Sequence, residues 1–154
     1  MRIVITGSGK QLSEADIDSF EKDLKISLPS EYRNFLLKNN GGYVEPNIFY
    51  YRDEDNFETN SAISIFFPLD SSFDNCLQVI VKAYRKRVPS HLMPIASDVF
   101  GNLVCLGVSE RNQCKIYFWD HERESNEFGD EGNVFLVADS LHDFLLSLLF
   151  SEDD

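Results

Sequence analysis

Four strand-like segments follow one another in the second half of the chain with no helical pattern between them. Strands joined without a helix pair antiparallel, because a parallel pair needs a long crossover connection. Two more strand-like segments lie upstream. The chain is therefore predicted to form a mainly antiparallel twisted sheet of about five to six strands. The segments are residues 43–50, 63–67, 93–96, 103–108, 115–119 and 134–137, with a polar loop predicted over residues 52–62.

A first helix is predicted near the amino terminus, after a short strand-like segment at residues 3–6. Ser13 is a typical N-cap residue, and Asp16 stands at the third helical position. The helix should run from Ser13 to about residue 23. Its apolar residues recur at helical spacing and share one face: Ile17, Phe20 and Leu24.

A second helix is expected to begin with Pro29 in its first turn, because a proline there removes no helical hydrogen bond. Tyr32 and Phe35 then recur at helical spacing. Gly41, which Gly42 follows, should end this helix, since glycine adopts the left-handed C′ conformation that a side chain resists.

Two more helices complete the predicted fold. The third buries apolar residues at helical spacing: Phe73, Leu77, Ile80, Val81 and Tyr84. Basic residues complement its dipole and are interpreted as a solvated C-terminus: Arg85, Lys86 and Arg87. The last helix begins at Asp139 or Ser140 and buries Leu141, Phe144, Leu145, Leu148 and Leu149. N-terminal helices, one middle helix and a C-terminal helix packed around an antiparallel sheet make a single α+β domain.

Composition and charge restrict the function classes. The chain has 154 residues, of which 43% are hydrophobic, and this is enough for one core without a disulfide or a metal. The formal net charge is −12, so neither nucleic acid nor an anionic membrane is expected as a direct partner. Cys76, Cys105 and Cys114 are widely spaced and odd in number, which is typical of buried thiols. We expect a cytoplasmic protein with no cofactor.

The acidic residues are concentrated in three short segments. One interpretation is that these segments are solvated loops, which keep the protein soluble. The other is an acidic face that captures a basic protein. The segments hold Asp53, Glu54, Asp55 and Glu58; then Asp120, Glu122, Glu124, Glu127, Asp130 and Glu131; and last Glu152, Asp153 and Asp154.

Two patterns resemble catalytic or ligand sites. Residues 7–10 follow a strand-like segment, but the first glycine of a phosphate-binding loop is replaced by Val4 and its Ser or Thr by Gln11, so a turn is the better interpretation. Asp120, His121 and Glu122 are residue types that bind metals or transfer protons. Neighbouring strand residues face opposite sides, so we favour a structural role, in which Asp120 or His121 fixes the strand end through backbone hydrogen bonds. Direct contact with a partner is the other alternative.

Aromatic residues near the acidic segments are candidate interface anchors, because exposed aromatics carry much binding energy. One of Phe118 and Trp119 should face the core, and the other is a candidate anchor. Tyr51 and Phe57 flank the first acidic segment in a stretch that holds more aromatics than one sheet face can hide.

Two motifs carry a family resemblance. Asp98, Gly101 and Asn102 form a predicted turn, because Asp and Asn bond to nearby backbone and Gly supplies positive φ. The turn lies between a proline-led strand and a strand that ends in Trp-Asp-His-Glu. With the upstream motif, the chain over residues 12–150 resembles the SUKH superfamily of the fungal cell-wall regulator Smi/Knr and many bacterial immunity proteins. The motifs are residues 26–36, 39–42, 94–106 and 117–122.

The resemblance implies a binding protein and not an enzyme. We expect an immunity protein that binds the toxic domain of a cognate bacterial toxin, for example a nuclease, and blocks it stoichiometrically. A chain of charge −12 would be steered to a basic active-site groove. Two alternatives stay open: a regulatory or scaffold protein of the fungal kind and, as the weakest hypothesis, a small metal-dependent hydrolase.

Overall fold

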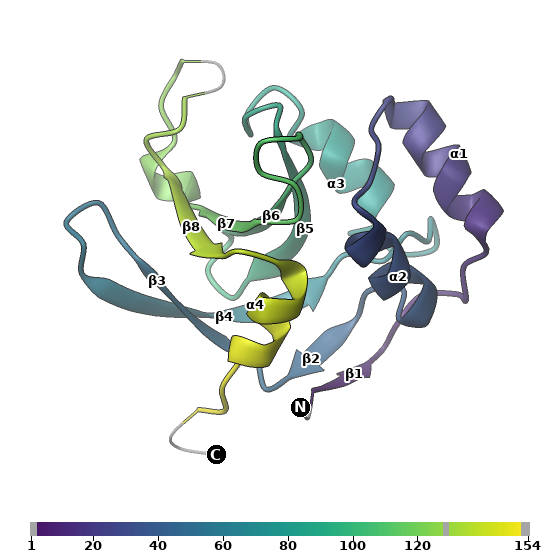
Figure 1. Cartoon of the computed structure of the whole chain (residues 1–154), viewed down its shortest axis with the longest axis horizontal. Coiled ribbons are helices and arrows are strands. Elements are labelled where there is room, and N and C mark those ends of the chain that lie inside the picture. The colour runs from purple at the N-terminus through teal and green to yellow at the C-terminus, as the bar shows by residue number, and fades with distance from the viewer. Residues whose placement is uncertain (1–2, 128–129, 152–154) are drawn as a thin grey trace.

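A six-stranded antiparallel sheet forms the centre of the protein (Figure 1). The structure is a computed structural model that describes residues 3–127 and 130–151. Each strand pairs antiparallel with the next in the chain, which confirms the predicted mainly antiparallel sheet. The strands are β3 (Ile48–Arg52), β4 (Glu58–Phe66), β5 (Leu92–Asp98), β6 (Leu103–Gly107), β7 (Ile116–Trp119) and β8 (Val134–Ala138).

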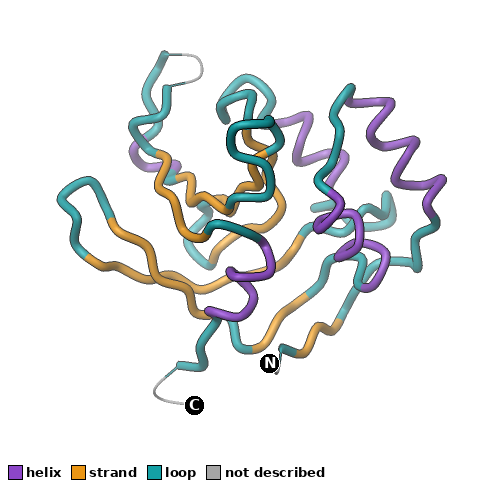
Figure 2. The backbone as a smooth tube through the Cα atoms, viewed as in Figure 1, coloured by secondary structure: helices purple, strands orange, loops and turns teal. Residues whose placement is uncertain are grey.

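Two short strands and four helices complete the described part of the chain (Figure 2). The short strands, β1 (Val4–Thr6) and β2 (Tyr43–Glu45), pair antiparallel as a separate sheet. The helices are α1 (Glu14–Leu24), α2 (Ser30–Lys38), α3 (Leu77–Ala83) and α4 (Leu141–Ser147), with one 3₁₀ turn, η1 (His121–Arg123). This is the predicted α+β fold.

The large sheet curls until its two edge strands, β3 and β8, come into contact. Tyr51 of β3 stacks on Phe118 with ring centroids 4.4 Å apart, and its ring lies 5.8 Å from that of Phe135 on β8. The ring of Phe49 lies 5.8 Å from that of Phe118 and 5.7 Å from that of Phe144 on α4. Register shifts in three of the strand pairs increase the twist, because a bulge bends its strand. The sheet therefore closes around an aromatic core.

Helix α1 begins as the sequence predicts. Ser13 is its N-cap: the Ser13 Oγ accepts the Asp16 N–H at 3.2 Å, and the Asp16 carboxylate accepts the Ser13 N–H at 2.8 Å. These hydrogen bonds lower the pKa of the Asp16 carboxyl. The apolar face of α1 packs into the core through Ile17, Phe20 and Leu24.

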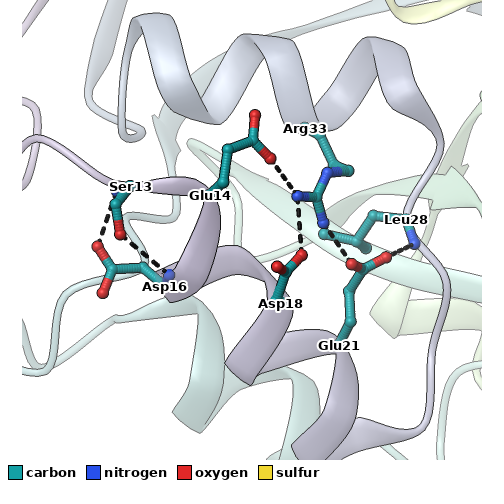
Figure 3. A network of polar contacts seen from close by, with 7 residues as sticks. All are labelled: Ser13, Glu14, Asp16, Asp18, Glu21, Leu28 and Arg33. Atoms are coloured by element: carbon teal, nitrogen blue, oxygen red, sulfur yellow. Dashed lines mark hydrogen bonds and ion pairs between the residues drawn. The ribbon is translucent and has the colours of Figure 1, made fainter.

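An ion network that the sequence did not predict joins α1 to α2 (Figure 3). Arg33 of α2 pairs with Glu14, Asp18 and Glu21, which share one face of α1 because they are four and three residues apart. The Arg33 Nη2–Asp18 Oδ1 distance is 3.0 Å, and the hydrogen bond to Glu14 is the main cause of the raised pKa of Arg33. Glu21 also accepts the Leu28 N–H at 2.6 Å. The network holds both helices and the loop between them.

The prediction of a polar loop at residues 52–62 is wrong, because most of that segment is strand. β3 extends to Arg52 and β4 begins at Glu58, so a short turn connects them. Polar residues of β4 follow the alternation of a strand that has one face in water: Asn60 is exposed and Ser61 is buried. Such residues hide a strand from a search for apolar alternation.

Two helix ends also differ from the prediction. Helix α2 ends at Lys38 with an extended C-cap, so Gly41 is not its left-handed C′ residue. Gly41 still has a positive φ of 70°, and the position has no room for a side chain, because a Cβ there would lie 2.6 Å from the Phe66 carbonyl oxygen. Helix α4 ends at Ser147, and Leu149, which was predicted to be buried, is 52% exposed because the chain has left the helix and pairs with β3.

Candidate functional site

Three connections of the large sheet lie at the same end, because its strands are antiparallel and follow chain order. We define the loop end of the sheet as the β3–β4 turn (residues 53–57), the β5–β6 turn (98–102) and the start of the β7–β8 connection (120–123). The first and the last of these lie on the left of the view in Figure 1. The loop end carries six carboxylates, one guanidinium and one imidazole. It therefore concentrates negative charge.

The β5–β6 turn is built around the carboxylate of Asp98, which is 3% exposed. This carboxylate accepts hydrogen bonds from the Ser61 hydroxyl at 2.7 Å, from the Phe100 N–H at 3.0 Å, and from the Asn102 N–H and Nδ2 at 2.7 and 3.0 Å. Gly101 adopts a φ of 88° in the same turn. A buried carboxylate is tolerated only when its oxygens are hydrogen-bonded, so Asp98 and its donors hold one another in place.

Asn102 connects this turn to His121 at the end of β7. Carboxylate oxygens only accept hydrogen bonds, so the Asn102 Nδ2 faces Asp98 and its Oδ1 faces His121. That Oδ1 accepts the His121 backbone N–H at 3.0 Å and lies 2.5 Å from the His121 Nδ1, which therefore carries a hydrogen. A Cβ on Gly101 would lie 3.5 Å from the His121 ring, so the ring packs on the turn.

Asp120 holds the first turn after β7. Its carboxylate accepts the Glu122 N–H at 3.0 Å, and its backbone carbonyl accepts a hydrogen bond from the Asn133 Nδ2 at 3.0 Å. Asp120 thus makes the backbone hydrogen bond that the structural interpretation of this segment expects, whereas the His121 imidazole contacts the side chain of Asn102. Within residues 3–127 and 130–151, no group of three or more His, Cys, Asp or Glu side chains is arranged to hold a metal ion.

Arg123 brings two acidic segments together at the loop end. Its guanidinium pairs with Glu54 of the β3–β4 turn and lies 3.2 Å from the Asp120 carboxylate. The pKa of the Tyr51 phenol is raised, mainly because the group is partly buried. The nearby negative charges of Asp120 and Asp98 raise this pKa further. The first acidic segment and the start of the second therefore form one surface.

Comparison with known proteins identifies the family. The sequence profile of the SMI1 / KNR4 family (SUKH-1) matches residues 11–147. The chain belongs to this family. One relative is the SPbeta prophage-derived uncharacterized protein YokK of Bacillus subtilis (strain 168), which is 28% identical over 149 residues covering 86% of this chain and 72% of the relative. Among the described residues, this SUKH-1 protein has no helix that is long and apolar enough to cross a membrane.

In this SUKH-1 protein, the second acidic segment leaves the loop end after Arg123. Glu124 pairs with Arg87 through both carboxylate oxygens, at 3.0 and 2.8 Å. The Arg87 guanidinium lies 4.6 Å from the centre of the Tyr84 ring and 5.6 Å from that of the Trp119 ring. Arg87 is therefore paired with Glu124 and lies against two aromatic rings, while it stays exposed with Arg85 and Lys86, as expected of a solvated helix end.

The remaining acids of that segment are also dispersed. Glu131 lies 2.8 Å from the imidazole of His91, and hydrogen bonds within its own loop lower the pKa of Asp130. Glu127 is exposed. The second acidic segment thus does not form one continuous patch, because Arg87 and His91, which lie far from it in sequence, contact two of its acids. The third segment, residues 152–154, lies outside the described residues.

The acids that stay available at the loop end are few. Asp55 and Glu122 are exposed, as is Glu58 beside the loop end, and none of the three forms a salt bridge with any residue that the structure describes. Asp53 is half-buried because it braces its own turn, and Glu54 is paired with Arg123. The surface is acidic, but part of its charge is already neutralised.

Trp119 is not an interface anchor, because its side chain is 0% exposed, and that of Phe118 is 2% exposed. The sheet is covered on both faces here: Phe118 faces the Tyr51 ring, and the Trp119 ring lies 5.8 Å from that of Tyr84. Tyr51 itself belongs to the aromatic core and is half-buried. Phe57 is the one candidate anchor of the sequence analysis that lies mainly in water, with 69% exposed.

The upstream motif, residues 26–36 and 39–42, lies outside the loop end and contributes side chains to the core. Pro29 is the N-cap of α2, and Tyr32 and Phe35 are buried in the core. Gly42 exchanges two backbone hydrogen bonds of 2.9 Å with Phe66 of β4. These contacts join the small sheet and α2 to the large sheet.

Sequence reasoning missed Ser61, Arg123 and Phe100. The hydrogen bond from Ser61 to Asp98 forms only because β4 lies beside the Asp98 turn in the fold, which the sequence alone does not show. Arg123 had a visible signal, because it is a lone cation within a run of acids. Phe100 had a clearer one: a large apolar residue between the Asp and the Gly of a tight turn has no core to enter.

Proposed function

We propose that this SUKH-1 protein is an immunity protein, which binds the toxic domain of a cognate bacterial toxin and neutralises it by stoichiometric occlusion. The observation that carries this proposal is the loop end, where six carboxylates stand against one guanidinium. The SUKH resemblance, which implies an immunity role, supports it, as does the prophage origin in the name of the relative YokK.

The partner that fits the loop end is a basic protein. A nuclease toxin has a cationic groove for its phosphate substrate, and an acidic surface seated in that groove blocks the substrate. The net charge of −12 speeds the encounter, because opposite fields steer two proteins together. Salt at 0.1 M screens this field within about 10 Å, so the steering appears as a salt-dependent association rate.

Binding, and not catalysis, is the role we infer for the polar residues of this surface. The Asp98 carboxylate is occupied by its four donors, and the His121 Nδ1 is engaged by Asn102. Asp120 caps η1 and pairs with Arg123. These groups hold the β5–β6 turn and the start of the β7–β8 connection in place, and rigid turns meet a partner with little loss of conformational entropy.

The proposal is tested by co-expression with the toxic domain encoded beside the gene in its source genome. The wild-type chain should restore growth to cells that express that domain and should co-purify with it at equal stoichiometry. The proposal is overturned when neither product of the adjacent genes is toxic or bound, or when neutralisation needs only catalytic amounts of this protein.

A pair of charge variants locates the surface. Asp55→Lys with Glu58→Lys reverses two unpaired acids at the hairpin of the loop end. Glu110→Lys with Asp139→Lys reverses two exposed acids beyond the opposite end of the sheet. Each acid-to-lysine change adds two units of charge, so each double variant has a net charge of −8 instead of −12. The two variants differ only in where the charge is reversed. Loss of protection with the first variant alone assigns binding to the loop end.

A further inference from the structure

Two turns of the loop end have the same construction. In the β3–β4 turn, the Asp53 Oδ1 accepts the N–H groups of Asp55 and Phe57, both at 3.0 Å. The Asp53 N–H also donates to the Phe57 carbonyl at 3.0 Å. Asn56, at the fourth position, has a positive φ of 64°.

The β5–β6 turn repeats this pattern position by position. The Asp98 Oδ1 accepts the N–H groups of Phe100 and Asn102, at 3.0 and 2.7 Å. The Asp98 N–H donates to the Asn102 carbonyl at 3.0 Å. Gly101, at the fourth position, has a positive φ of 88°. In each turn one aspartate therefore fixes the backbone of the four residues that follow it.

Each of these braced turns presents a phenylalanine to water. Phe100 is 70% exposed and Phe57 is 69% exposed, and no other large hydrophobic residue among those described is as exposed. Neither side chain contributes to the core. An aromatic residue on a backbone that is already braced needs little further ordering of its turn when it is buried, so it makes a strong anchor.

We propose that Phe57 and Phe100 are paired anchors that insert into apolar pockets of one cationic protein partner. This inference rests on the proposed function and names the residues that give its surface affinity. The negative charge around the two phenylalanines favours a cationic partner, because Glu54, Asp55 and Glu122 lie in the segments that form the loop end. A second copy of this chain and a nucleic acid would both bring like charge to these acids.

One partner can cover both anchors. Ile63 of β4 lies opposite Asp98, and it follows Glu58, at the edge of the other turn, by five positions along β4. At about 3.3 Å per residue, the two turns are offset by roughly 17 Å along the strand. A standard interface covers about 800 Å² per partner, which is roughly 30 Å across. Both phenylalanines therefore fall within one ordinary footprint.

The test measures binding of the neighbouring toxic domain to immobilised full-length chain. Phe57→Ser and Phe100→Ser should each weaken binding at least about 30-fold through faster dissociation, with unchanged melting temperature, because both side chains lie in water. The matched control is Phe150→Ser, since Phe150 is 60% exposed and follows α4 outside the loop end. It should change the dissociation constant less than about twofold.

A second pair of variants tests the bracing. Asp53→Ala and Asp53→Asn remove the same charge, but only asparagine keeps an Oδ1 for the two turn amides. Asp53→Ala should therefore weaken binding several-fold more than Asp53→Asn, and hydrogen exchange at the Phe57 amide should speed up only in the alanine variant. Equal binding by the two variants contradicts the bracing.

The outcomes separate the two proposals. If the wild-type chain does not bind the neighbouring domain, the proposed function is overturned, and the proposal of paired anchors is overturned with it. A wild-type chain that binds while Phe57→Ser and Phe100→Ser bind equally well overturns only the anchors. Loss of binding in Phe150→Ser, or in just one of the two loop-end variants, overturns the pairing.

Discussion

Asp98→Ala is the substitution that most directly tests how the loop end is held together. The Asp98 carboxylate is 3% exposed and accepts four hydrogen bonds, of which two come from side chains, those of Ser61 and Asn102. A hydrogen bond to a charged group contributes about 1.5–3 kcal/mol. Bonds within one network are not additive, so we expect a total loss of about 3–5 kcal/mol in the free energy of unfolding. For a chain of this length, this loss lowers the melting temperature by roughly 10 °C.

Urea unfolding followed by tryptophan fluorescence measures this loss, because Trp119 is the only tryptophan and is buried beside the network. Asp53→Ala is the matched control: Asp53 has the same place in its turn but is only half-buried and accepts hydrogen bonds from only two backbone amides. It should lose about 1 kcal/mol. Equal losses in the two variants would refute the claim that burial of the Asp98 network holds the loop end.

Other substitutions and conditions have distinct expected results. Gly41→Val should destabilise the fold more than Gly101→Val in urea unfolding, since both positions have positive φ but only a Cβ at Gly41 meets backbone at 2.6 Å; equal losses would contradict this difference. Burial raises the pKa of Tyr32, so the native state holds a proton that the unfolded state releases above pH 10; the free energy of unfolding should fall as pH rises past 10, and a flat profile would count against this burial. Burial also raises the pKa of the Cys105 thiol, and it raises that of the Cys114 thiol to about 11. A thiol reagent at pH 8 should therefore modify these two cysteines only in denaturant. Rapid modification of the native protein would contradict their burial.

Local patterns predicted the parts of the fold that depend on local chemistry. Ser13 and Asp16 identified the start of α1, because capping needs only nearby backbone. The spacing of strand-like segments identified the antiparallel sheet, because short connections leave few alternatives. Gly101 was recognised as a positive-φ position from its Asp and Asn neighbours.

Tertiary contacts decided what local patterns could not. The strand at Asn60 and Ser61 was missed because its polar residues face water on one side and Asp98 on the other. Trp119 was considered as an anchor because nothing near it in sequence shows that Tyr84 covers it. The acidic segments looked continuous, but Arg87, which is remote in sequence, meets Glu124 and divides the second one.

The central claim is that the acids of the loop end receive a cationic partner. The most direct measurement is the stopped-flow association rate of the neighbouring toxic domain with two double variants of equal charge, over a series of salt concentrations. Asp55→Lys/Glu58→Lys should associate at least about tenfold more slowly than Glu110→Lys/Asp139→Lys at low salt, and the difference should shrink as salt screens the field. Equal association rates for the two variants at every salt concentration would contradict the account.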